Sequence, residues 1–392
     1  QALIAAGELP QPRRTLRFLW LPEMTGTYAY LESLEDDLDK MVAGVNLDMV
    51  GEDQEQTGSS WLIERPPDAA ASFAPVLLAR LRDELPGLKG MTDVSPTHTD
   101  LGAYPLYRQA EVAFTGGSDH YIFSDPSVGI PTASLGQGPD RDSHTSADTA
   151  DRTAPQSLAR AGSWAAIYAY WLAAAGPSEV IWLGHEMTAR FKIGVVETAQ
   201  ATVTRALTMD DEETISAALA ELERRLAYLF DRHKTALLSL RRLAPIECLA
   251  DDMLAESEQV VNRGLSWAGR AAGLHAATLH LDAFPAPSPP DLSEEELEAE
   301  KLVPARLVKG PVPLESHMEK LVDEDREAWR QLLQARKGWS YYTLTTLALY
   351  WADGARSLLD IADRVEMEAS TRDVELLLAY FRLLEKLGLV TF

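Results

Sequence analysis

The sequence predicts an α/β fold, a three-layer sandwich with a mostly parallel (mixed) sheet, followed by an all-helical region and a C-terminal winged helix. Three observations predict it. Short apolar runs of strand length alternate with helical patterns over the first 175 residues. Residues 195–280 are helical in pattern throughout. The last forty residues follow the order helix, turn, helix, strand, which is typical of a winged helix.

The first domain begins with a strand, a helix and a second strand. Residues 15–21 are apolar and aromatic and are ended by Pro22, which predicts a buried strand. Residues 28–40 have the apolar spacing of a helix. Residues 41–50 form a second apolar run and predict a second strand. This order is that of a βαβ unit in an α/β sheet.

The rest of the first domain contains two further helices and a short strand. Residues 68–89 predict an amphipathic helix, residues 128–135 a strand around Pro131, and residues 155–175 a helix that closes the domain. A boundary at Gly176 gives a first domain of residues 1–176.

The second half of the chain is predicted to be helical and segmented. We expect a helical region over 177–284, a Pro-rich acidic linker over 285–300, a helical connector over 301–337 and a winged-helix-like domain over 338–392. The histidines scattered over these helical segments are interpreted as surface or capping residues: His185, His233, His275, His280 and His317.

Charge and composition exclude several classes of partner. The formal net charge is −24, and residues 338–392 hold eight acidic and five basic side chains, so we expect no nucleic-acid partner. No apolar run reaches the ~18–20 residues of a membrane span, so we expect no membrane partner. The single cysteine, Cys248, excludes an intrachain disulfide framework; together with the lack of a visible export signal it suits the cytoplasm.

Polar side chains follow the predicted strands at three places. Glu23 follows the strand over 15–21, Asp48 lies near the end of the second strand, and the loop residue His144 has Asp148 four positions later. Functional groups gather at the carboxyl ends of strands in α/β sheets, and Glu, Asp and His together form a ligand set suited to zinc. Taken singly, Glu23 could instead be a helix-start carboxylate, and His144 an ordinary loop histidine.

These residues and their neighbours resemble the co-catalytic zinc exopeptidases of the bacterial leucyl-aminopeptidase type, relatives of glutaminyl cyclases. The C-terminal half resembles the helical and winged-helix extension of a bacterial subgroup of these proteins. The matching stretches occur in the family's order across residues 1–175: Arg14-Thr-Leu-Arg-Phe-Leu-Trp, Pro-Glu23-Met-Thr-Gly26, Asn46-Leu-Asp48-Met-Val-Gly51, Gly117-Ser-Asp119-His120-Tyr-Ile-Phe123, Gly129-Ile-Pro131 and His144-Thr-Ser-Ala-Asp148.

The resemblance implies a metal-assisted hydrolase of peptide or small amide bonds whose substrate has a free amino group. Asp48 and His144 match zinc ligands, and Glu23 matches the general base that takes a proton from the zinc-bound water. One or two zinc ions are implied, and zinc would activate the water and polarise the scissile carbonyl.

Three further positions follow from the same resemblance. Asp119 and His120 match a segment that lines the substrate site, where His120 would help to hold the tetrahedral intermediate. Asp148 matches a residue that orients the loop of His144.

The sequence also departs from the family pattern. The second glutamate, a zinc ligand in the family, is Met24 here, and a thioether is a poor zinc ligand. A shifted loop would make Glu23 itself the ligand. The family's first histidine ligand and bridging aspartate lie upstream of the strand over 15–21. His98 and Asp100 have the right spacing but the wrong place in the chain order, and we interpret them as a loop coincidence.

This chain therefore supplies at most three of the expected ligands. We expect either that a preceding segment is missing, that it is provided by a separate chain or a homo-oligomer, or that activity has been lost. The alternative function is a catalytically inactive relative acting as a protein-binding module. A transcriptional regulator using the winged helix conflicts with the negative charge of residues 338–392.

Overall fold

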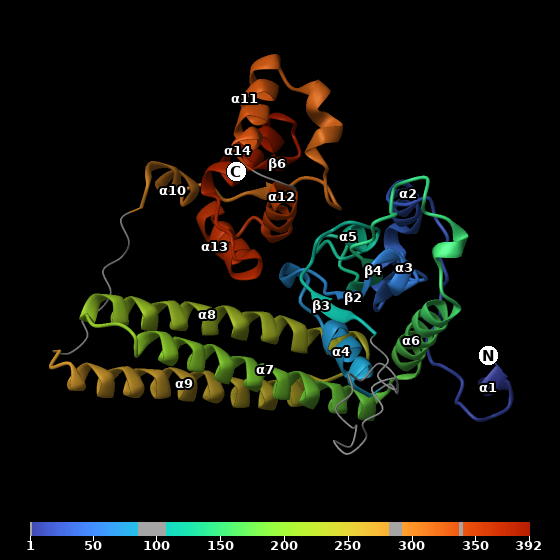
Figure 1. The fold of residues 1–392 in the computed structure, drawn as a ribbon, viewed down its shortest axis with the longest axis horizontal. Coiled ribbons are helices and arrows are strands. Elements are labelled where there is room, and N and C mark those ends of the chain that lie inside the picture. Colours follow the sequence, from blue (N-terminus) through green and yellow to red (C-terminus); the bar gives the residue numbers. More distant parts are fainter. Residues whose placement is uncertain (1, 85–106, 282–291, 337–339) are drawn as a thin grey trace. The chain divides into compact units, whose positions relative to one another are not determined.

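The computed structural model describes residues 2–84, 107–281, 292–336 and 340–392 (Figure 1). The chain divides into two compact units, Gln1–Pro177 and Ser178–Phe392. None of the described helices combines the length and the apolar character needed to cross a membrane. A mixed sheet with flanking helices, followed by a helical C-terminal region, confirms the predicted α/β class.

The N-terminal unit is built on a mixed four-stranded sheet with the strand order β1-β4-β2-β3. Strand β4 is parallel to β1 and antiparallel to β2, which in turn is parallel to β3. The register places Ser134 opposite both Asn46 and Glu64. The four strands are β1 (Gly44–Leu47), β2 (Ser60–Glu64), β3 (Gln109–Val112) and β4 (Thr132–Gly138).

Short helices and turns complete this unit around one longer helix, α6. They are α1 (Ala2–Ala5), α2 (Thr25–Leu34), η1 (Glu35–Lys40), α3 (Gln54–Thr57), η2 (Asp68–Ala70), α4 (Ala74–Glu84), α5 (His120–Phe123), η4 (Ala150–Arg152) and α6 (Pro155–Ala174).

The two faces of the sheet differ in chemistry. Trp61 and Ile63 on β2 point to the same face of the sheet, and each is 2% exposed. The centroid of the Trp61 ring lies 6.2 Å from that of Trp164 on α6. Helices α4 and α6, which contact each other, cover this apolar face (Figure 1). The opposite face carries the polar side chains of Asn46, Ser134 and Glu64. The chemistry of the unit therefore gathers on the face away from α6.

The predicted buried strand over residues 15–21 is wrong. The segment has no regular secondary structure and is largely exposed: Phe18 is 74% and Trp20 87% exposed, and their rings stack on each other. The adjacent Arg13 N–H is anchored on Ala173 O, but no backbone hydrogen bond pairs residues 15–21 with any described strand. A run of apolar and aromatic residues favours a strand. The strand forms, however, only where a neighbouring strand makes hydrogen bonds to its backbone N–H and C=O groups.

The other elements expected in this unit are present. The helix over 28–40 appears as α2 and η1, the strand over 41–50 as β1, and the helix over 155–175 as α6. The helix over 68–89 appears as η2 and α4, and residues 85–89 lie outside the described residues. The strand predicted over 128–135 begins later, at Thr132, because Pro131 has no N–H to donate.

Three long helices open the C-terminal unit, as predicted over 195–280. They are α7 (Pro177–Ala206), α8 (Glu212–Ser239) and α9 (Glu247–Thr278), and their apolar stripes meet in one core. Val195, Leu222, Leu226 and Ala268 in that core are nearly or fully inaccessible to solvent. Asp211 caps the start of α8 by accepting the Thr214 N–H.

One histidine of this bundle is a core residue, so its interpretation as a surface or capping residue is wrong. His233 stacks on Phe191 at 4.3 Å between ring centroids, and its Nε2 lies 3.1 Å from Ser257 Oγ. Ser257 donates its only hydroxyl proton to Met253 O, so His233 Nε2 must be the donor. Burial, together with the charge of Arg232, lowers the pKa of His233 to about 4.

The remaining helices and two short strands form the end of the chain. The predicted order of helix, turn, helix and strand after residue 351 is observed, whereas its identity as a winged helix stays a prediction.

Part of the segment expected to be a linker, residues 294–299, is helical because Ser293 and Glu296 form a capping box; residues 285–291 lie outside the described residues. The elements are η5 (Leu240–Arg242), α10 (Glu294–Ala299), β5 (Ala305–Arg306), η6 (Leu314–Lys320), α11 (Asp323–Gln334), α12 (Ser340–Trp351), α13 (Leu358–Ala369), α14 (Val374–Lys386) and β6 (Val390–Thr391), with β5 and β6 antiparallel.

Candidate functional site

Four loops with candidate residues converge where β1 and β4 end. Asp48 directly follows β1, and its N–H donates to Leu135 O on β4. Two residues before Asp48, Asn46 Nδ2 donates hydrogen bonds to Ser118 Oγ at 2.9 Å and to Ser134 Oγ at 3.3 Å. These contacts bring the turn before α5 to the carboxyl end of β1. The polar face of the sheet therefore leads directly into the candidate site.

Asp119 fixes the loop that carries Glu23. Its Oδ1 accepts hydrogen bonds from the Met24 N–H and from Thr27 Oγ1, both at 2.8 Å. Met24 has φ +56°, a left-handed conformation that is unfavourable for a residue with a side chain and is often found at functional sites. Glu23 itself is exposed. Asp119 thus acts on the geometry of its neighbours, while Glu23 is the carboxylate that faces solvent.

His120 is buried and paired with a carboxylate that the sequence analysis missed. The side chain is 1% exposed, and Nε2 lies 2.7 Å from Oε1 of Glu64, the last residue of β2. Glu64 also accepts the Thr115 N–H and hydroxyl and the Gly116 N–H. Burial alone would raise the pKa of Glu64, but the bonds from His120 and Thr115 outweigh it and lower the pKa. A glutamate at a strand end is the same signal that identified Asp48, so it could have been found.

The His144 loop lies next to the residue that follows Asp48. Ser143 Oγ is 3.8 Å from Met49 Sδ, so the chain neighbours of His144 and Asp48 are in contact. Both Met49, at φ +53°, and His144, at φ +59°, are left-handed. His144 and Asp148 are exposed, and Asp148 is linked back to the loop through its N–H. The structure thus brings together the segments that carry the two candidate metal ligands.

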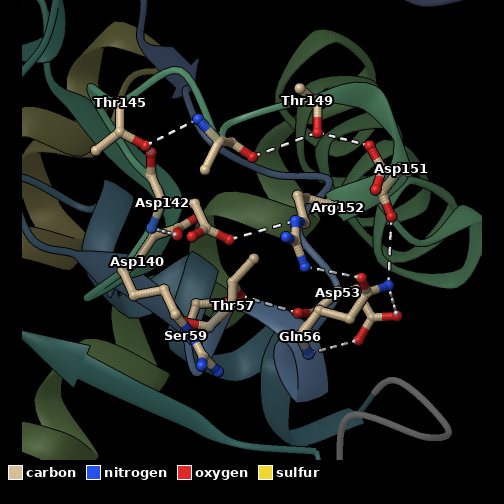
Figure 2. A network of polar contacts seen from close by, with 12 residues as sticks. Asp53, Gln56, Thr57, Ser59, Asp140, Asp142, Thr145, Thr149, Asp151 and Arg152 are labelled. Carbon is tan, nitrogen blue, oxygen red and sulfur yellow. Dashed lines mark hydrogen bonds and ion pairs between the residues drawn. The ribbon is translucent and has the colours of Figure 1, made fainter.

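A polar network anchors this loop to the rest of the unit, as Figure 2 shows. Asp142 is buried, with Oδ2 3.5 Å from Arg152 Nε, and its carbonyl oxygen accepts a bond from Thr145 Oγ1. Arg152 O in turn accepts the N–H of Asp53, the residue that caps α3. The Asp142 N–H donates to Asp140. The turn before His144 is therefore held in part by an ion pair between buried Asp142 and the partly exposed Arg152.

Glu52 is a second carboxyl group near the site that the sequence analysis missed. Its carbonyl oxygen accepts bonds from Gln137 Nε2 and Ser157 Oγ. Burial raises the pKa of Glu52, and the charges of Asp140 and Asp148 add to the effect. A half-buried glutamate beside other carboxylates has no distinctive sequence signal, because its neighbours come from a loop far along the chain.

The residues present do not fit a complete zinc site. Across the described ranges, no three His, Cys, Asp or Glu side chains are grouped so that they could hold a metal ion. Met24, at the position of a family ligand, adds none. His98 and Asp100 lie outside the described residues.

Comparison with protein families gives one match. The sequence model of peptidase family M28 matches residues 2–169, which cover all four converging loops. No curated protein and no solved structure is significantly similar to the chain.

Proposed function

Because the sequence model of peptidase family M28 matches residues 2–169, we propose that the protein is an aminopeptidase-like hydrolase of peptide or small amide bonds. The substrate would carry a free amino group. Zinc dependence is part of the proposal, with Asp48 and His144 as the ligands from this chain. The observation that carries the proposal is the convergence of the Glu23, Asp48 and His144 loops at the ends of β1 and β4.

The side chains at this edge divide into two tasks. Glu23 is an exposed carboxylate on a fixed loop, which suits a general base that accepts a proton from water. Asp119 holds that loop through Met24 and Thr27, so Glu23 does not have to be placed at each turnover.

The proposal predicts zinc-dependent turnover by the full chain that depends on Asp48. The test is hydrolysis of a panel of aminoacyl-p-nitroanilides with added zinc or with a chelator, together with zinc titration by calorimetry. We expect turnover by the wild type in zinc only, and loss of both turnover and zinc binding in Asp48→Asn. Asp210→Asn, which removes an exposed carboxylate of the C-terminal unit, is the matched control and should behave as wild type.

A second candidate is a catalytically inactive relative that acts as a protein-binding module. Met24 at a ligand position and the lack of a three-residue metal group among the described residues favour it. The same experiment separates the two. Wild-type protein that binds no zinc and hydrolyses none of the anilides would establish the inactive relative and end the hydrolase proposal.

A further inference from the structure

Glu64 has no part in the hydrolysis proposed above, and His120, which the family resemblance places beside the tetrahedral intermediate, is buried and bonded to Glu64. Glu64 Oε1 lies 2.7 Å from His120 Nε2, and it also accepts the Thr115 N–H at 2.6 Å and the Gly116 N–H at 3.1 Å. Oε2 accepts the Thr115 hydroxyl at 2.8 Å. The Phe114 ring lies edge-on to the imidazole, 5.6 Å from it. A largely buried carboxylate that accepts four hydrogen bonds is held in one position.

The pair is connected to the Glu23 loop through one tripeptide, Ser118–His120. His120 is bonded to Glu64 at the end of β2, and the preceding Asp119 is bonded to Met24 and Thr27. Ser118 accepts a bond from Asn46 on β1. Adjacent residues of one turn therefore contact two strands and the loop. A rotation of this turn would move the Asp119 carboxylate away from the Met24 amide.

The Glu23 loop needs such external support. Met24 is left-handed, and non-glycine residues keep this conformation only where surrounding contacts impose it. The bond from the Met24 N–H to Asp119 is the contact that does so, because it is made to a charged acceptor on a fixed turn.

We propose that Glu64 and His120 are positioning residues: they fix the Ser118–His120 turn so that Asp119 holds the loop over residues 22–27 and presents Glu23 at the site edge. The role of Glu23 as a base rests on the proposed function. The geometry of the loop does not rest on that function, and it can be measured in a protein that has no enzymatic activity.

Hydrogen exchange followed by mass spectrometry tests the geometry on the full chain. In Glu64→Gln we expect peptides covering residues 113–124 and 22–28 to exchange roughly tenfold faster, while peptides from α6 exchange as in wild type. Glu111→Gln, on the neighbouring strand β3 in exposed ion pairs with Arg65 and Arg82, is the matched control and should leave residues 22–28 unchanged. Faster exchange confined to residues 113–124 would overturn the proposal.

A second variant covers the case in which Glu64→Gln does not fold. Thr115→Val removes one hydroxyl bond to Glu64 from an exposed residue. It should accelerate exchange at residues 22–28 by a smaller factor, about twofold to threefold. Unchanged exchange there would count against the connection.

A kinetic experiment tests the part of the proposal that depends on the protein being a hydrolase. If the wild type turns over, Glu64→Gln should lower kcat about tenfold with little change in KM, because a misplaced base affects the chemical step. A raised KM at unchanged kcat would contradict the assignment. A wild type without turnover would defeat the proposed function alone, since the exchange result would still decide the positioning role.

Discussion

Replacing Gly136 with alanine is expected to displace Asp48 and to lower the free energy of unfolding of the N-terminal unit by about 1–3 kcal/mol. A Cβ at this position of β4 would lie 2.8 Å from the Asp48 carbonyl oxygen, closer than real side chains approach. The obstacle is backbone, and the Asp48 N–H is bonded to Leu135 O. Relief of the clash must therefore shift the segment that carries the candidate ligand.

Gly162→Ala is the matched control for this substitution. Gly162 lies in α6, where an added Cβ has no neighbour within 4 Å among the described residues. Alanine there should stabilise the helix by up to ~1 kcal/mol. Local stability is measured by hydrogen exchange of β2 and β4 peptides, and Asp48 by zinc titration. Wild-type stability and zinc affinity in Gly136→Ala would show that β1 and β4 do not approach so closely.

Acidification is expected to destabilise the helical bundle through His233. Above pH 6.5 the imidazole is neutral in both the folded and the unfolded chain and contributes no pH dependence. Between pH 6.5 and about 4 the unfolded chain binds a proton that the folded bundle excludes, so the free energy of unfolding falls as the pH falls. His233 therefore lowers the free energy of unfolding by about 2–3 kcal/mol at pH 4.5 relative to neutral pH.

The prediction is measured as a difference between variants, because many carboxylates titrate in the same range. His233→Gln keeps an N–H donor for Ser257 and removes the titrating ring. Urea unfolding followed by circular dichroism at pH 7.5 and 4.5 should show a smaller loss in this variant than in wild type. The exposed His185 on α7 gives the control, and His185→Gln should keep the wild-type loss. Equal losses in all three proteins would remove His233 as the cause.

Local sequence patterns predicted most of the elements and the order of the candidate loops. The helix over 155–175, the strand containing Asn46 and the helices of the C-terminal half each carry their own periodicity and end signals. Glu23, Asp48 and His144 were predicted as candidates because each stands in a short motif in a loop or after an apolar run. These patterns can be recognised from the sequence because they depend on residues that are close together along the chain.

Pairing and burial were not contained in those patterns. The apolar run over 15–21 has the composition of a strand but no described neighbour to hydrogen-bond with, and it lies exposed. His233 has the polarity of a surface residue, yet Phe191 and Ser257 from two other helices enclose it. In both cases the outcome depends on which segments become neighbours.

The sequence by itself determined the α/β class, the helical C-terminal half and the loops that would carry the chemistry. Only the tertiary structure decided that Glu64 is bonded to His120, that Asp119 holds the Glu23 loop, and that no three ligand-type side chains are grouped together among the described residues. The physical reason is range. Helix and strand preferences act over a few residues, whereas the candidate site is held by hydrogen bonds between groups that are 56 or 95 positions apart in the chain.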